Sequence, residues 1–206
     1  MSTANLRDLP LRERKKLRVR QALTDTALRL FTEKGYDATT LDDLCDAVEV
    51  SKRTFFRNFP SKEDVALAAD SELWSAYLIE VETIEFHASV LTALQGALVT
   101  TLTRMDQDWE RRFLTARALC DTLPAVQAHS LRYCNDTTQA LVDQVGARLS
   151  LEGDVRLRLV VEVTVAAWRS AYPGWTATDG TGGRDELIRR LDETFAAVPA
   201  AIDLSA

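Results

Sequence analysis

TTLDDLCDAVEVSKRTFFRNFPSK, residues 39–62, contains the pattern of two short helices joined by a tight turn. Its first half has apolar residues at i, i+3, i+4 and i+7, the spacing of one helix face: Leu41, Leu44, Cys45 and Val48. Thr40 and Ser51 stand where the two helices begin, and each hydroxyl can accept a free backbone N–H of the first turn. Pro60 ends the second helix, and Ser61 is placed to cap a third.

The second helix begins with cations and aromatic residues, Lys52-Arg53-Thr54-Phe55-Phe56-Arg57. Two helices joined in this way form a helix-turn-helix. In DNA-binding proteins with this unit, the second helix lies in the major groove and contacts bases through its N-terminal residues. The segment therefore predicts a DNA-binding unit. The alternative interpretation is that the cations form a solvated helix face.

The segment from about Arg18 to Ala69 resembles the DNA-binding domain of the tetracycline-repressor (TetR) family of transcriptional regulators. The agreement at fixed spacing lies in Ala27, Leu30, Phe31, Gly35, Tyr36, Thr39, Thr40, Leu44, Val50, Ser51 and the run from Thr54 to Glu63. The resemblance implies an all-α fold, with an N-terminal three-helix helix-turn-helix domain and a larger C-terminal helical domain for ligand binding and dimerisation. We accordingly expect an N-terminal arm and DNA-binding domain at residues 1–62, and an effector-binding and dimerisation domain at residues 63–206.

The resemblance also implies DNA contacts at eight positions: Thr40, Ser51, Lys52, Arg53, Thr54, Phe56, Asn58 and Lys62. The guanidinium of Arg53 can donate hydrogen bonds to both O6 and N7 of guanine, and the methyl group of Thr54 can contact the methyl group of thymine. Thr40, Ser51, Asn58 and Lys62 match family positions that hold phosphates, and such contacts set register more than sequence preference. Phe56 stands where the family often has a phosphate-binding tyrosine, so its contribution would be apolar.

The sequence predicts unusual backbone φ angles at two positions near the turns. Gly35 should end the preceding helix with a positive φ, which glycine adopts without steric cost. Glu49 departs from the family, which usually has a left-handed glycine at this point of the turn. A non-glycine residue in that conformation carries roughly 1 kcal/mol of strain. The sequence therefore predicts either a strained Glu49 or a slightly altered turn.

The charge distribution agrees with DNA binding although the formal net charge of the 206-residue chain is −6. Residues 1–62 hold 13 Lys and Arg against 9 Asp and Glu, whereas the remainder holds 12 against 22. A phosphate backbone responds to the local charge rather than the total. Residues 11–20 carry six cations and one acid, and they follow a stretch, residues 1–10, that we interpret as a loose arm. The cationic segment is either an arm that touches phosphates or a minor groove, or a solvated helix start.

Composition excludes several other classes of protein. A hydrophobic content of 46% with only 8 Gly and 5 Pro favours a helix-rich globular chain. No apolar run approaches the roughly 18 residues of a membrane helix, and the N-terminus lacks the apolar segment of a secretory signal. We therefore expect a cytoplasmic protein without a membrane partner. The sequence contains no nucleophile elbow, and its glycine-rich segment, residues 180–183, lacks the lysine that follows in a phosphate-binding loop. We therefore expect no enzymatic activity.

Three cysteines and two histidines provide little material for a metal or thiol centre. The cysteines are odd in number and have no metal-ligand spacing, and His129 and Cys134 are five residues apart, which is poor for one helix face. We therefore expect no metal, no cofactor and buried thiols that act as small apolar groups. A thiol- or metal-sensing regulator on the same scaffold is an alternative.

The rest of the chain predicts further helices. The first runs up to about Lys34, and a long one begins at Ser61 and continues to about Glu82. Others are expected over residues 88–105, 108–122, 125–149 and 185–198, with a turn and a new N-cap at residues 152–154 and a loop at residues 173–183.

Residues 155–172 are ambiguous by pattern alone. Their valines and leucines alternate as in a strand, but they also form a helical stripe, and eighteen residues without Gly or Pro exceed a usual strand. The resemblance favours a helix. A helix that is apolar nearly all round must be buried, so we predict that residues 155–172 and 185–198 form a homodimer interface that includes Val161 and Leu191.

The C-terminal part also contains aromatic residues that could enclose a ligand. By resemblance to the family, a small-molecule effector, most simply an apolar one, would bind among Tyr77, Met105, Phe113, Tyr133 and Trp168. The alternative is that these side chains are core. The complete hypothesis is a ligand-responsive repressor that binds a palindromic operator in double-stranded DNA as a homodimer. A helical protein that has lost DNA binding is the competing hypothesis, and the basic residues of the second helix argue against it.

Overall fold

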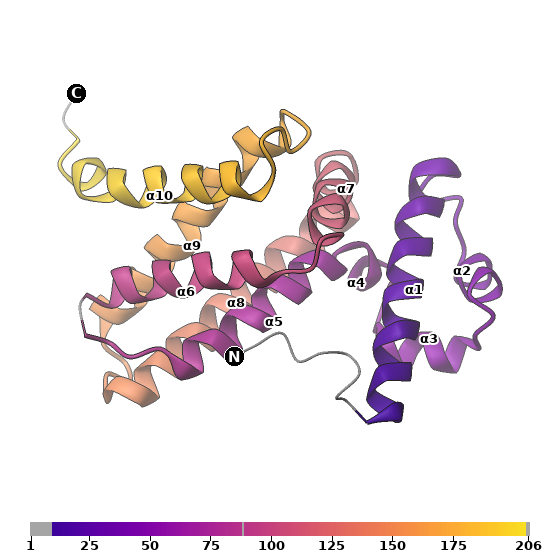
Figure 1. The fold of residues 1–206 in the computed structure, drawn as a ribbon, viewed down its shortest axis with the longest axis horizontal. Coiled ribbons are helices and arrows are strands. Elements are labelled where there is room, and N and C mark those ends of the chain that lie inside the picture. The colour runs from indigo at the N-terminus through magenta and orange to yellow at the C-terminus, as the bar shows by residue number, and fades with distance from the viewer. Residues whose placement is uncertain (1–9, 88, 205–206) are drawn as a thin grey trace. The chain divides into compact units, whose positions relative to one another are not determined.

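The computed structural model describes residues 10–87 and 89–204. All regular structure in these residues is helical, which confirms the predicted all-α class. Figure 1 shows the helices, which are α1 (Leu11–Glu33), α2 (Leu41–Ala47), α3 (Lys52–Asn58), α4 (Lys62–Ala66), α5 (Ala68–Thr83), α6 (Val90–Arg104), α7 (Trp109–Thr122), α8 (Pro124–Leu149), α9 (Val155–Thr176) and α10 (Gly183–Ile202).

The chain divides into two compact units. The N-terminal unit comprises Met1–Ser71 and Arg111–His129, and the C-terminal unit comprises Glu72–Glu110 and Ser130–Ala206. Helices α5, α7 and α8 each continue from one unit into the other. The domain boundary expected after residue 62 stays a prediction.

The N-terminal unit is built around α1, which packs against α2, α3 and α4. Its core contains apolar residues from all four helices and from the segments of α7 and α8 that belong to the unit, among them Leu23, Phe31, Leu44, Phe55, Phe59, Val65, Cys120 and Val126. The predicted caps are confirmed: the hydroxyls of Thr40, Ser51 and Ser61 accept the backbone N–H groups of Asp43, Thr54 and Asp64. The predicted arm at residues 1–10 lies, apart from Pro10, outside the described residues.

The single helix predicted from Ser61 to Glu82 is wrong. The chain leaves the helical conformation at Leu67, where φ is −98° and ψ is 19°, so that α4 and α5 are separate helices. No Gly or Pro marks this break in the sequence. Val65 to Ala69 are all buried, and consecutive residues of one helix point in directions about 100° apart. A continuous surface helix could not bury all of them on one face, and the break follows from this packing.

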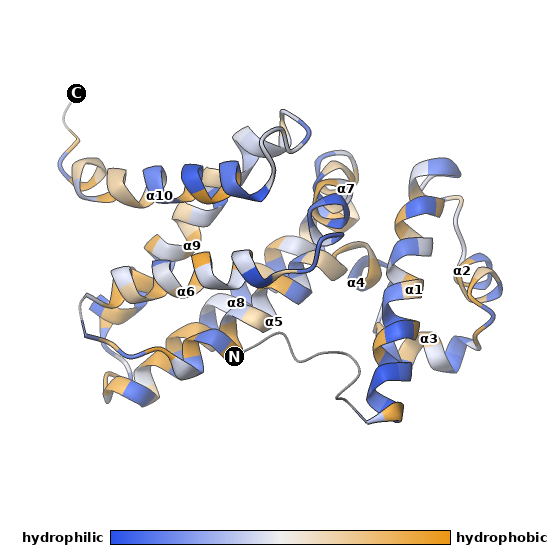
Figure 2. Cartoon of the chain, in the orientation of Figure 1, coloured by the Kyte–Doolittle hydropathy of each residue, from blue (hydrophilic) through white to orange (hydrophobic). Residues whose placement is uncertain are grey.

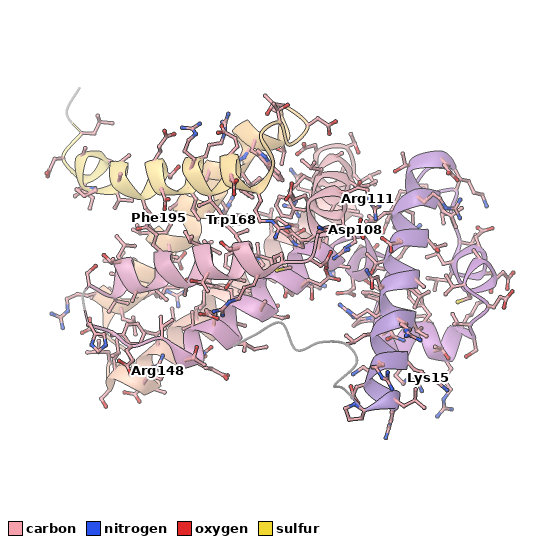
Figure 3. All side chains as sticks on the ribbon, in the orientation of Figure 1. Lys15, Asp108, Arg111, Arg148, Trp168 and Phe195 are labelled. Atoms are coloured by element: carbon pink, nitrogen blue, oxygen red, sulfur yellow. The ribbon has the colours of Figure 1, made fainter. Side chains whose placement is uncertain are left out.

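The C-terminal unit contains α6, α9 and α10 and the adjoining parts of α5 and α8. Helices α9 and α10 pack against each other, and α6 packs against both. Phe195 lies on the side of α10 that faces these helices and is 5% exposed (Figure 3). At the end of α5, Arg148 of α8 donates hydrogen bonds to the carbonyl oxygens of Val81 and Ile84.

The structure resolves the ambiguity at residues 155–172 in favour of a helix and confirms Asp154 as its N-cap. The loop predicted from Pro173 is wrong at its start, because α9 continues to Thr176 with Pro173 inside its last turn. The fully buried side chain of Trp175 anchors this extra turn. The last helix is also longer than predicted, since α10 begins at Gly183 and passes through Pro199 to Ile202. None of the described helices is long and apolar enough to cross a membrane.

The positive φ predicted for Gly35 is confirmed, at 91°, and of the two alternatives for Glu49 the structure shows the left-handed conformation, with a φ of 55°. We expect Glu49→Gly to raise the melting temperature or leave it unchanged. Relief of about 1 kcal/mol of strain is offset in part by the extra chain entropy that glycine brings to the unfolded state. The control is Ala118→Gly at an exposed interior position of α7, which should cost about 1 kcal/mol. A marked loss of stability in Glu49→Gly, comparable to this control, would contradict the account.

Candidate nucleic-acid interface

Helix α3 is held in place by one side and presents the other to solvent. The side chain of Phe55 is fully buried, and its ring contacts the ring of Phe59 at 6.1 Å between centroids. The turn that precedes α3 is closed by a hydrogen bond from the N–H of Val50 to the carbonyl of Cys45 (2.9 Å). The residues that remain exposed are Ser51, Lys52, Arg53, Phe56 and Arg57. Five of the described residues at this end of the motif thus form one accessible, cationic face.

An acidic residue of α2 is placed beside this face, which the sequence did not reveal. Asp42 forms an ion pair with Lys52 at 2.8 Å, and both side chains are more than half exposed. The hydrogen bond and the charge of Asp42 raise the pKa of Lys52. Exposed pairs of this kind contribute little stability, so a phosphate can compete with Asp42 for the ammonium group. Lys52 is therefore charged and available at the start of α3.

The hydroxyls expected to hold phosphates are engaged in helix caps. The side chain of Thr40 accepts the N–H of Asp43 and donates to its carboxylate (2.7 Å), and Lys34 pairs with that same carboxylate at 2.9 Å. The hydrogen bonds from Lys34 and Thr40 lower the pKa of Asp43. Ser51 accepts the N–H of Thr54, and the two hydroxyls lie 3.1 Å apart. Both caps are exposed, so a second bond to a phosphate is geometrically open to them.

Asn58 and Lys62 point into the protein rather than away from it. Asn58 is 8% exposed, and its side-chain amide donates to the carbonyl of Thr54 (2.7 Å). The Lys62 ammonium donates to the carbonyls of Tyr36 (2.8 Å) and Thr39 (3.1 Å). Phosphate contacts by these two residues stay predictions. Arg53 and Phe56 belong to the exposed face described above, with Phe56 51% exposed, whereas Thr54 is half-buried.

The cationic segment of residues 11–20 forms the first half of α1, where Figure 2 shows mostly hydrophilic residues and Figure 3 labels Lys15. One of its cations is structural. Arg20 donates to the carbonyl of Asn58 (2.5 Å), and its guanidinium lies 4.1 Å from the ring centroid of Phe59. Arg20 thus ties α1 to the end of α3, while Arg12, Lys15 and Lys16 are exposed.

The predicted effector residues fall in both units. In the C-terminal unit Tyr77 and Trp168 are buried, and Trp74 joins their rings into one cluster, with centroid distances of 5.7 Å to Tyr77 and 6.3 Å to Trp168. The hydroxyl of Tyr77 donates to the carbonyl of Leu94 (3.0 Å). Met105 and Tyr133 are half-buried in the same unit. This packing is that of a core, and a ligand site there stays a prediction.

Phe113 belongs to the N-terminal unit and is fully buried on α7. The same unit contains a surface groove of about 430 Å³ between α1 and α7, lined by Asp25, Thr26, Leu28, Arg29, Thr32, Glu33, Arg111 and Thr115. Arg111, labelled in Figure 3, forms an ion pair with Asp25 at 3.0 Å across it. None of the five predicted effector residues lines this polar groove.

The cysteines and histidines form no evident sensor centre. None of the three cysteines, which all lie in the described residues, forms a disulfide. Cys45 and Cys120 are buried, and burial raises the pKa of Cys45. A raised pKa disfavours the reactive thiolate. Among residues 10–87 and 89–204, no group of three or more His, Cys, Asp or Glu side chains could hold a metal ion.

Comparison with known proteins gives matches along most of the chain. Residues 23–69 match the family model described as "Bacterial regulatory proteins, tetR family", and residues 88–202 match the model described as "MftR C-terminal domain". The chain is 35% identical over 173 residues to the HTH-type transcriptional regulator TcmR of Streptomyces glaucescens, an alignment that covers 80% of this chain and 76% of TcmR. A shorter match, 40% over 47 residues, is to IcaR of Staphylococcus aureus, a negative transcriptional regulator of a biofilm operon, and covers 23% of this chain and 25% of IcaR.

Solved structures share the fold at low sequence identity. A transcriptional regulator from Pseudomonas aeruginosa PAO1 superposes with a TM-score of 0.54 at 12% identity, covering 97% of each chain. A transcriptional regulator from Rhodococcus sp. Rha1 superposes with a TM-score of 0.53 at 16% identity, covering 93% of this chain and 99% of the other.

Proposed function

The chain belongs to the tetR family of bacterial regulatory proteins, and we propose that it is a repressor that binds a palindromic operator as a homodimer and is released by a small-molecule effector. The observation that carries the proposal is the exposed face of α3. It presents Lys52, Arg53 and Arg57 to solvent, while Phe55 anchors the opposite side of the helix. The similarity to TcmR and IcaR, both named as transcriptional regulators, supports the same function.

The exposed residues of α3 have different proposed roles in DNA binding, since some contact bases and others contact phosphates. Arg53 lies in the first turn of α3, where a recognition helix approaches base edges. Its guanidinium can donate hydrogen bonds to both O6 and N7 of guanine. Lys52 and the exposed cations of α1 serve phosphates, which adds affinity without sequence preference. Arg57 lies in the last turn of α3 and is also assigned to phosphate.

The dimer would use the exposed apolar stripe of α9 and α10. Val155 and Leu159 are 67% and 59% exposed and lie one turn apart. Val161 and Leu191, which we expected in the interface, are fully buried within the C-terminal unit and cannot form its surface. The first half of α10 exposes charged residues, whereas the exposed positions of its second half include four small residues: Ala196, Ala197, Ala200 and Ala201. A self-complementary pairing of these surfaces gives the two-fold symmetry that a palindromic operator requires.

The effector would bind in the C-terminal unit, beside the aromatic cluster of Trp74, Tyr77 and Trp168. An apolar small molecule suits this lining. Because α5 carries Tyr77 and also begins in the N-terminal unit, one helix connects the proposed effector site to the unit that contains the DNA-binding face. An effector that shifts this helix weakens DNA binding only in so far as it binds the two states with different affinities.

Arg53→Ala tests the assignment of base recognition. We expect binding to the preferred duplex to weaken by about 1–3 kcal/mol and preference to relax at one base pair. Arg57→Ala is the matched control, an exposed arginine of the same helix, and should weaken binding to all sequences about equally. The preferred duplex is first selected from genomic fragments that the protein binds at moderate salt. Fluorescence anisotropy then measures the affinity of each variant for this duplex and for its single-base-pair variants. Identical sequence profiles for wild type and Arg53→Ala would contradict the assignment, and the absence of any preferred fragment would contradict the proposed function.

A further inference from the structure

Helix α9 keeps one face in the core of the C-terminal unit and leaves the opposite face exposed. The residues along the exposed face recur at i, i+4, i+7 and i+11, the spacing of one side of a helix: Val155, Leu159, Glu162 and Ala166. Val155 and Leu159 are 67% and 59% exposed and lie one turn apart. Apolar side chains of this size gain free energy when a second surface removes them from water. A partner that covers this face would therefore bind around these two residues.

Two opposite charges lie beside Leu159 on this face. The side chains of Arg158 and Glu162 are 46% and 50% exposed, and the closest nitrogen and oxygen of the pair are 3.4 Å apart. A well-formed bond between a guanidinium and a carboxylate is shorter than this. A helix also favours an acid four residues before a base, and here the base comes first. The contact within the helix is thus weak, and the carboxylate of Glu162 can pair with another cation.

Arg158 is held at the edge of the exposed face by α8. Its Nη1 donates to the side-chain oxygen of Gln139 at 2.8 Å, and the amide nitrogen of Gln139 donates to the carboxylate of Asp143 at 2.8 Å. A guanidinium has five N–H donors, so donors remain for a further acceptor. A side chain that is already held loses less conformational freedom when it binds. Arg158 is therefore prepared to pair with an acid outside its own helix.

Two-fold symmetry determines what these charges would meet on a second copy of α9. If two copies cross antiparallel about an axis beside Leu159, each residue faces the residue that lies equally far on the other side of the axis. Arg158 then meets Glu162 of the partner subunit, and Leu159 lies next to its own copy. Val155 falls opposite Ala166 of the partner subunit, where a small side chain leaves room for it.

The same charges disfavour the other arrangements of two α9 helices. A parallel crossing places Arg158 against its own copy and Glu162 against its own copy. In the antiparallel crossing, a slide of one helix by one turn in either direction brings one of these two charges against its own copy. Like charges that meet in an interface suppress that arrangement. The exposed face of α9 therefore fits a second copy of itself in one orientation and one register.

We propose that α9 pairs antiparallel with α9 of a second copy, with Leu159 at the centre of the contact and an ion pair on each side of the axis between Arg158 of one protomer and Glu162 of the other. This inference rests on the proposed homodimer. It adds the orientation of the two subunits and the residues that select the partner.

Reversal of either charge tests the pairing. Arg158→Glu brings two acids together at both contacts, and Glu162→Arg brings two bases together. We expect each variant to raise the dissociation constant of the dimer about a hundredfold or more. The matched control is Arg169→Glu, which reverses an exposed arginine about three turns further along α9 and should remain a dimer. Size-exclusion chromatography coupled to light scattering measures the mass over a range of protein concentrations, and circular dichroism checks that each variant is folded.

A mixture of the two variants separates a contact between subunits from an effect within the helix. In the mixed dimer the acid introduced at position 158 faces the base introduced at position 162, and the native Arg158 faces the native Glu162. Both contacts are then attractive. We expect the mixture to form heterodimers in preference to either homodimer, and native mass spectrometry distinguishes these species by mass.

The pairing and the proposed homodimer fail in different ways. Single variants that dimerise as tightly as a dimeric wild type would overturn the pairing alone. Variants that are monomeric separately and stay monomeric when mixed would also overturn it, because the substitutions would then act within one chain. A wild type that is itself monomeric at every concentration would overturn the homodimer together with the pairing.

Discussion

Asp70→Leu should lower the free energy of unfolding of the protein by about 3–5 kcal/mol, because it removes one partner of a buried ion pair. Asp70 of α5 and Arg117 of α7 lie 2.8 Å apart in the N-terminal unit and are 6% and 8% exposed. Burial raises the pKa of Asp70 in spite of the neighbouring guanidinium. Removal of the carboxylate takes the ion pair with Asp70 away from Arg117 in a medium of low dielectric constant.

The double variant Asp70→Leu/Arg117→Met is the control for this prediction. Replacement of both charges by apolar side chains of similar size is often neutral or stabilising. We therefore expect urea denaturation to show most of the lost stability restored in the double variant. A single variant that unfolds at the same urea concentration as the wild type would show that the pair lies in a far more polar environment than the structure indicates.

Leu159→Arg should convert the protein from dimer to monomer and weaken operator binding by about 10²–10⁴-fold. The magnitude follows from the loss of simultaneous binding to two half-sites. Leu159 is 59% exposed on α9, so an arginine there can be solvated in the monomer and the variant should remain folded. Two such charges would face each other across a two-fold axis and repel.

Leu131→Arg provides a matched control for the dimer prediction. Leu131 is a 54% exposed leucine of α8, outside the stripe on α9 and α10. This variant should remain a dimer and bind the operator as the wild type does. Light scattering coupled to size-exclusion chromatography measures the mass of each variant. A dimeric Leu159→Arg with full affinity would place the interface on another surface.

Local sequence signals predicted the helix-turn-helix in detail. The spacing of Leu41, Leu44 and Cys45 gave the buried face of α2, and capping hydroxyls at Thr40 and Ser51 placed the helix starts. The left-handed φ of Glu49 was one of two alternatives implied by the resemblance to the family, which usually has a glycine at this point of the turn. These features depend on a few neighbouring residues, so that a local pattern is enough to predict them.

Features that depend on distant parts of the chain were not predictable in this way. The break at Leu67 follows from the burial of consecutive residues, and the extra turn after Pro173 follows from the burial of Trp175. The ion pair between Asp42 and Lys52 could have been suspected, because α2 and α3 are adjacent in the motif. The bonds from Lys62 to the carbonyls of Tyr36 and Thr39 carry no sequence signal, since backbone acceptors are present at every residue.

Selection of preferred sequences from a library of random duplexes tests the central claim, sequence-specific DNA binding by a homodimer, most directly. We expect the enriched sequences to contain an inverted repeat, with half-site centres about one helical turn apart or more. We also expect affinity for the selected duplex to fall steeply as salt is raised, because bound cations release counterions from the phosphates. Enrichment of no sequence, or of a single half-site bound by one protomer, would contradict binding by a homodimer.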